Sequence, residues 1–170
     1  MAINYYDPAV SENHRDRFLK YKRKFIINPD QWETILGKYN HFNWNEVHFQ
    51  PVNLLSLNEV EGIYLFLASP KKVNASFINY FFYVGETNNL RRRYNEYLAK
   101  AHSPKSGQYK VQQIIKDFNE HLYFYYVELP GFNQIQRRIV EDDFLTAFLP
   151  PINSKYPQGL QSIVLGAYQQ

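Results

Sequence analysis

The 170-residue chain contains no cysteine. This absence excludes disulfide bonds and thiolate metal sites. No apolar run approaches the length that a membrane-spanning helix needs, and the first eight residues lack the apolar core of a secretory signal. These absences favour a soluble, cytoplasmic protein with no membrane partner.

A large excess of one charge is also missing. The 19 basic and 16 acidic residues give a net charge of +3, and many unrelated domains have such a balance. The distribution of the charge says more than its sum. Basic residues cluster between positions 15 and 24 and again at Arg91, Arg92 and Arg93. Each cluster is either a solvated surface or a surface that contacts phosphates.

Aromatic residues are abundant, with 15 tyrosines and 13 phenylalanines. A hydrophobic content of 45% is ordinary for a globular protein, and the length suits one domain. Most of these rings must therefore pack in a core, which leaves a few for a site.

Two segments rich in branched and aromatic residues, 62–67 and 80–84, predict β-strands. A loop over 68–79 joins them, so we expect an antiparallel pair. The Asn and Thr residues at 87–89 then predict the start of a helix. Its apolar residues recur at helical spacing: Leu90, Tyr94, Tyr97 and Leu98.

The remaining pattern predicts a helix that begins at 28–30 and ends at Gly37, a loop over 38–51, a helix over 111–118, a strand over 121–129, a helix over 133–148, and a short final strand over 162–167. In the helix over 133–148, the expected buried stripe consists of Ile135, Ile139, Phe144 and Phe148, and Glu141 lies at its border.

Five features in chain order resemble the GIY-YIG nuclease family. They are Gly62-Ile63-Tyr64, then Tyr83-Val84-Gly85, Arg93 on the following helix, Glu141 on a later helix, and Asn153 in a Pro-containing loop. The resemblance implies an α+β fold with a small central antiparallel sheet flanked by helices. It covers residues 59–155. We therefore expect an N-terminal extension at 1–58, which packs on the core or contacts a partner or DNA, and a C-terminal tail at 156–170.

The same resemblance implies roles for the site residues. Glu141 would hold one divalent cation, Mg²⁺ or Mn²⁺, and Arg93 would clamp the scissile phosphate. Tyr64 would act as the base with Tyr83 as its orienting partner, although a phenol is a poor base at neutral pH unless a cation lowers its pKa. Tyr97 stands one turn after Arg93, as in the excision-repair branch of the family. Asn153 would orient the site or tie its loop.

Other charged residues near the motifs are candidates for DNA contact: Lys71, Lys72, Arg91 and Arg92. Glu86 stands where the repair branch often has lysine. A carboxylate there would repel a substrate phosphate unless it points away or joins the metal shell.

The resemblance predicts a metal-dependent endonuclease that hydrolyses DNA to 5′-phosphate and 3′-hydroxyl ends, of the restriction or mobile-element and phage type. Such an enzyme with one site cuts both strands either as a homodimer or by successive nicks. Two other functions stay open: a non-catalytic nucleic-acid-binding module on the same scaffold, and a protein-interaction domain.

Overall fold

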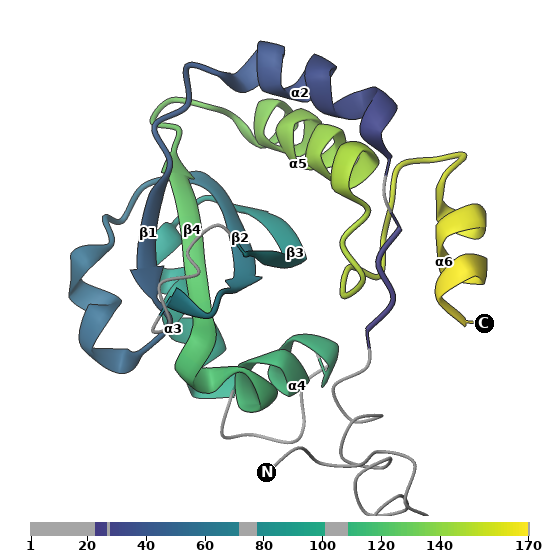
Figure 1. The fold of residues 1–170 in the computed structure, drawn as a ribbon. Coiled ribbons are helices and arrows are strands. Elements are labelled where there is room, and N and C mark those ends of the chain that lie inside the picture. The colour runs from purple at the N-terminus through teal and green to yellow at the C-terminus, as the bar shows by residue number, and fades with distance from the viewer. Residues whose placement is uncertain (1–22, 27, 72–77, 101–108, 170) are drawn as a thin grey trace, which may run out of the picture.

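The computed structural model describes residues 23–26, 28–71, 78–100 and 109–169 (Figure 1). The expected basic segment between 15 and 22 and the candidate Lys72 lie outside these residues. Within them, no helix is both long enough and apolar enough to cross a membrane.

A four-stranded antiparallel sheet forms the centre of the molecule, in the order β1-β4-β2-β3. The strands are β1 (Asn45–His48), β2 (Gly62–Ala68), β3 (Tyr80–Thr87) and β4 (Leu122–Glu128). Strand β2 is central, because it pairs with both β3 and β4. The expected α+β fold with a small antiparallel sheet is confirmed.

Strand β1 lies in the segment that the pattern assigned to a loop, so that assignment is wrong over Asn45–His48. Its first two side chains are exposed and polar, and the four residues show no clear apolar alternation. The strand exists because β4 offers a free edge with which it pairs. The sheet therefore begins before position 59.

Helices cover both faces of the sheet (Figure 1). On one face, α3 (Leu90–Lys100) and α4 (Tyr109–Asp117) share an aromatic core with the even-numbered side chains of β2, such as Tyr64 and Phe66. On the other face, α5 (Gln134–Phe148) packs against Ile63 and Val84. Helix α2 (Trp32–Tyr39) lies against α5 on the side away from the sheet. Short 3₁₀ helices occupy Pro29–Gln31, Pro51–Ser56 and Asn119–His121.

Helix α5 begins with a capping box, in which Asn133 and Gln136 exchange side-chain to backbone hydrogen bonds. Its expected buried stripe is wrong at two positions, because Ile135 and Ile139 are 72% and 49% exposed. The buried face instead contains Arg137, Val140, Phe144, Leu145 and Ala147. A charged residue thus continues the stripe, which apolar periodicity cannot predict.

The segment before the sheet holds the C-terminal end of α5 in place. The Trp32 indole N–H donates to the Ala147 carbonyl at 2.9 Å, and the Asn28 amide donates to the Thr146 carbonyl at 3.1 Å. These are carbonyls of the last helical turn, which have no partner within the helix. The Tyr39 hydroxyl also donates to Asp143 at 2.5 Å. Helix α2 runs past Gly37 to Tyr39, so the expected stop at Gly37 is wrong.

The final element is a helix, α6 (Gln161–Gln169), and the predicted strand over 162–167 is wrong. Val164 is buried against the α5 side of the core, and its backbone N–H donates to the Leu160 carbonyl four residues earlier. Leu160 and Val164 both pack against this core, and their spacing of four residues is typical of one face of a helix.

Candidate active site

The pairing of β2 with β3 brings two tyrosines to the same face of the sheet, next to a β-bulge. Tyr64 pairs with Gly85 and Phe66 pairs with Tyr83, but the next pair joins Leu67 to Phe81, so Phe82 is the extra residue of β3. Cross-strand partners share a face, and Tyr83 is therefore a diagonal neighbour of Tyr64. Their ring centroids are 6.1 Å apart.

Both motif glycines are required by close approach of other atoms. A Cβ atom on Gly85 would lie 2.3 Å from the Tyr64 hydroxyl oxygen, and one on Gly62 would lie 2.2 Å from the Val127 carbonyl oxygen. The Tyr64 ring cannot move away easily, because it is stacked on Phe124 at 5.2 Å. Gly85 thus makes the space in which the Tyr64 hydroxyl sits.

Helix α3 supplies the next two groups. The Asn89 side chain accepts from the Arg92 backbone N–H at 2.8 Å and caps the helix. Tyr97 places its hydroxyl 3.0 Å from that of Tyr64. Arg93, one turn earlier, donates to Glu96 at 2.8 Å. Its Nε is buried and has no hydrogen-bond partner among the described residues.

Burial raises the pKa of the Tyr64 hydroxyl well above its ordinary value, and the neighbouring hydroxyls of Tyr97 and Tyr83 add to this. The Arg93 guanidinium acts in the opposite direction and lowers that pKa. Burial likewise raises the pKa of Tyr83 and of Tyr97. All three phenols are therefore neutral in the free protein at neutral pH, and Arg93 is the group whose charge favours a phenolate.

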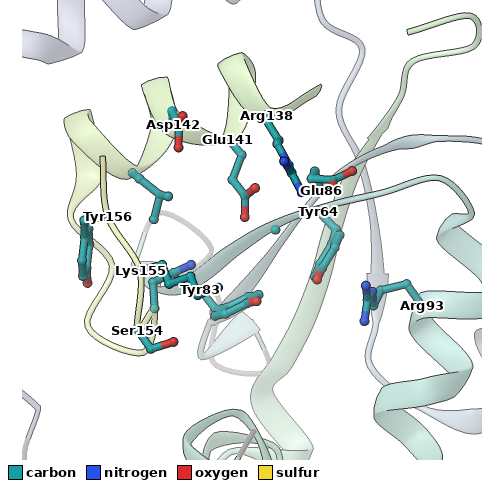
Figure 2. A pocket seen from close by; sticks show the side chains of 13 residues that line it. Tyr64, Tyr83, Glu86, Arg93, Arg138, Glu141, Asp142, Ser154, Lys155 and Tyr156 are labelled. Atoms are coloured by element: carbon teal, nitrogen blue, oxygen red, sulfur yellow. The ribbon is translucent and has the colours of Figure 1, made fainter. Parts of the chain in front are cut away.

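Glu141 lines the same pocket from α5 (Figure 2). Its carboxylate points into the space that Tyr64 and Tyr83 also line. Burial raises the Glu141 pKa to about 7, and the negative charges of Glu86 and Asp142 contribute to the rise. Burial disfavours the charged form of this carboxylate. A cation that enters beside it therefore stabilises that charged form.

Glu86 has a partner of its own. Its carboxylate accepts from the Arg137 Nε at 3.0 Å, and the two side chains are only 15% and 7% exposed. Arg137 in turn donates to the Phe132 carbonyl at 2.5 Å. The expected repulsion of phosphate by Glu86 is thus largely compensated by the buried guanidinium of Arg137.

Asn153 ties the loop after α5 to the edge of the sheet. Its amide donates to the Val84 carbonyl at 2.8 Å and its side-chain oxygen accepts from the Val84 N–H at 3.1 Å. The backbone N–H of Ile152 also donates to the Phe82 carbonyl at 3.1 Å. The chain turns toward β3 at Leu149, which ends α5 in a left-handed conformation with φ of 44°.

The structure places the other candidates outside this pocket. Lys71 pairs with Glu46, and its ammonium donates to the Tyr125 hydroxyl at 3.2 Å, on the β1 and β4 side of the sheet. Arg91 donates to the Leu57 carbonyl at 2.7 Å. Arg92 donates to Glu96 at 2.5 Å and lines a neighbouring groove.

The motif resemblance missed several pocket-lining residues, among them Arg138, Ser154 and Lys155. Arg138 stands three positions before Glu141, so helical spacing predicts that both share a face of α5. Lys155 follows Asn153 by two positions. Their proximity to motif residues was the available signal.

The pocket suits a hydrated Mg²⁺ ion. Its volume is about 570 Å³, and Glu141 supplies a hard oxygen ligand. No group of three potential metal-ligating His, Cys, Asp or Glu side chains exists among the described residues. Mg²⁺ commonly binds one or two carboxylates and keeps several of its waters. A site with a single glutamate therefore suits Mg²⁺ better than a metal that takes all of its ligands from the protein.

No protein-family model and no curated protein sequence matches the chain. The matches are solved structures of the GIY-YIG N-terminal endonuclease domain of UvrC from Thermotoga maritima. Its magnesium-bound form is 20% identical, with a TM-score of 0.43, and the match covers 60% of this chain and 92% of that one. A point mutant bound to its catalytic divalent cation is 19% identical with the same TM-score, over 61% and 93% of the two chains.

Proposed function

We propose that the protein is a metal-dependent endonuclease that hydrolyses DNA phosphodiester bonds to 5′-phosphate and 3′-hydroxyl ends. The observation that carries the proposal is the convergence of Tyr64, Tyr83, Arg93 and Glu141 on one pocket. These residues come from β2, β3, α3 and α5. Packing alone does not require two phenols, a guanidinium and a half-buried carboxylate to line the same opening.

In this proposal, the hydroxyls of Tyr64 and Tyr83 hold the attacking water. Tyr64 must lose its own proton before it can take one from that water, and the positive charge of Arg93 favours this loss. The Tyr97 hydroxyl, 3.0 Å away, can donate a hydrogen bond to the resulting phenolate. Arg93 also binds the scissile phosphate, because its guanidinium lines the pocket.

Glu141 would hold the divalent cation, Mg²⁺ or Mn²⁺, with its carboxylate. When bound, the cation supplies positive charge beside the phosphoryl oxygens and the departing 3′ oxygen. Asn153 keeps β3 and the loop after α5 together, so that the distance between Tyr83 and Glu141 stays fixed. Glu86 forms part of the pocket wall, and its ion pair with Arg137 carries no net charge.

Within this class, we propose a restriction-type or mobile-element and phage-type enzyme that acts on DNA as its partner. Such an enzyme cuts duplex DNA at defined positions, either as a homodimer or through successive nicks. Sequencing the ends of cleaved DNA tests this subclass, because recurrent end sequences support it and randomly placed ends contradict it.

The direct test of the proposal is cleavage of supercoiled plasmid by the purified protein with Mg²⁺. We expect the wild-type protein to nick or linearise the plasmid and Glu141→Ala to lose at least about 100-fold in rate. Glu33→Gln is the control, because it removes an exposed carboxylate of α2 that does not line the pocket, and it should keep cleavage. Equal cleavage by wild type and Glu141→Ala would contradict the metal-ligand assignment.

The second candidate is a nucleic-acid-binding module without turnover. Its supporting observation is the raised pKa of the buried phenols, which works against a phenolate base. If no protein cuts and all bind DNA with a steep salt dependence, the binding module is correct. If no protein binds nucleic acid even at low salt, an interaction domain with a vestigial site is correct.

A further inference from the structure

Two cations line the pocket on opposite sides of Glu141. Arg138 lies one turn earlier on α5 and is near Glu86 in Figure 2, whereas Lys155 lies next to Tyr83 on the loop after α5. Both side chains are exposed at the pocket opening. The family resemblance assigns no role to either residue.

The two differ from the other cations nearby in their pairing. Arg93 is bonded to Glu96, and Arg137 is bonded to Glu86. Within the described residues, neither Arg138 nor Lys155 has a carboxylate oxygen within 4.0 Å, although the charge of Arg138 lowers the pKa of Glu141 and of Asp142. Their donors are thus available to an anion that enters the pocket.

The backbone at Lys155 is held on both sides, unlike that of an ordinary surface lysine. Asn153, two residues earlier, is bonded to both backbone groups of Val84. Tyr156, the next residue, is buried, and its hydroxyl donates to the Pro150 carbonyl at 2.5 Å. Arg138 lies on a capped helix, one face of which is buried. The backbone positions of both residues are therefore fixed relative to Glu141.

We propose that Arg138 and Lys155 bind the two phosphates that flank the scissile phosphate, one on each side, so that the pocket takes at least three consecutive phosphates of one strand. The inference rests on the proposed function for the position of the scissile phosphate beside Arg93 and Glu141. Contacts to phosphates fix the register of a strand without reading its sequence. Cations are needed there because the carboxylates of Glu141 and Asp142 line the same opening and repel a polyanion.

Salt dependence of DNA binding tests the two contacts. A labelled duplex is titrated with Arg138→Ala, Lys155→Ala, the double variant and the control Lys116→Ala, which removes an exposed lysine on α4, at several salt concentrations in EDTA. Each pocket variant should bind about tenfold more weakly and lower the slope of log K against log salt by about 1. The double variant should lower the slope by about 2, and Lys116→Ala should leave it unchanged.

Lys155→Arg keeps the charge and should restore the slope, which separates lost charge from altered structure. In the cleavage assay, both alanine variants should raise KM more than they lower kcat, because they position the strand and do not touch the reacting atoms. Slopes of both alanine variants equal to that of the wild type would overturn the inference.

Failure of the inference and failure of the proposed function are distinguishable, because binding in EDTA requires no turnover. If the slopes change and no protein cuts, the phosphate contacts are supported and the nuclease proposal is contradicted. If the wild type cuts and the slopes do not change, the nuclease proposal is supported and this inference is overturned.

Discussion

At the scale of single residues, the site depends on one missing side chain. Gly85 leaves the space that the Tyr64 hydroxyl occupies, because a Cβ there would lie 2.3 Å from that oxygen. Stacking on Phe124 and the hydrogen bond to Tyr97 hold the Tyr64 ring from the other sides. The second triplet of the motif therefore serves the tyrosine of the first.

Gly85→Ala tests this dependence. We expect a loss of about 1–3 kcal/mol in the free energy of unfolding, because the methyl group overpacks a filled site, and a loss of cleavage activity because the Tyr64 hydroxyl is displaced. Urea denaturation measures the first effect. Gly37→Ala is the control: its Cβ would meet nothing within 4 Å, and it lies inside α2. That variant should be stabilised by about 0.5–1 kcal/mol.

Glu141 makes the stability of the metal-free protein depend on pH. Its pKa rises from an ordinary value of 4.5 to about 7 in the folded protein. A raised pKa means that the folded state favours the protonated form, so the folded state loses stability as pH rises from about 4.5 to about 7. Glu141→Gln removes this penalty. Its melting temperature should therefore exceed that of the wild type by a margin that grows from pH 5 to pH 8.

The measurement is thermal unfolding in EDTA across that pH range. Addition of Mg²⁺ at pH 8 should then raise the melting temperature of the wild type and leave Glu141→Gln unchanged, because a ligand that binds only the folded state stabilises it. A constant difference between the two proteins at all pH values would contradict the assigned position of the Glu141 carboxylate.

At the scale of elements, the site joins a rigid sheet to one braced helix. Strands β2 and β3 hold the tyrosines, whereas α5 holds Glu141 and is held in turn by Trp32, Asn28 and Tyr39. The segment before the motif thus takes part in the site indirectly, because it fixes the helix that carries the carboxylate.

Trp32→Phe tests this brace. The variant keeps an aromatic ring beside Phe148, which lies 6.2 Å from the Trp32 ring, but it loses the indole N–H that donates to the Ala147 carbonyl. We expect a loss of about 1 kcal/mol in stability, and faster hydrogen exchange in the last turn of α5. Leu36→Ala, on an exposed part of α2, should change stability by at most about 0.5 kcal/mol. Unchanged exchange in Trp32→Phe would contradict the dependence of the last turn of α5 on the Trp32 hydrogen bond.

Sequence patterns predicted the elements that strong periodicity marks: strands 62–67, 80–84 and 121–129 and the helices at 111–118 and 133–148. Three features depend on tertiary contacts and could not be predicted from the sequence pattern. Strand β1 forms on the edge of β4 without an apolar pattern. The face of α5 is set by the Arg137 and Glu86 pair. The β-bulge places Phe82 on the same face of the sheet as Tyr83, whereas regular alternation would put the two neighbouring residues on opposite faces.

For the site, the motif resemblance selected six residues: Tyr64, Tyr83, Arg93, Tyr97, Glu141 and Asn153. The structure brings five of them to one pocket, and Tyr97 contacts the Tyr64 hydroxyl without lining that pocket. Their catalytic and metal-binding roles remain proposals. Arg138 and Lys155 were not predicted, because an exposed basic residue has no sequence pattern that separates a phosphate contact from a solvated charge.

At the scale of the whole molecule, the fold brings together residues that are far apart in the chain. Strand β2 lies at the centre with partners on both edges, and the two helical layers bring α3 and α5 to the same end of the sheet. Net charge contributes little at +3, so attraction to DNA must come from local groups at the pocket.

The central claim is that Glu141 and Arg93 act together on one phosphate. Single-turnover cleavage of a labelled duplex with Mg²⁺ tests it in the wild type, Glu141→Gln, Arg93→Ala and the double variant. Each single variant should lose at least about 100-fold in rate, and the double variant should be only a few-fold slower than the slower single variant, because residues of one catalytic unit are not additive. A double variant whose loss equals the product of the two single losses, or single variants that cut like the wild type, would contradict a shared site.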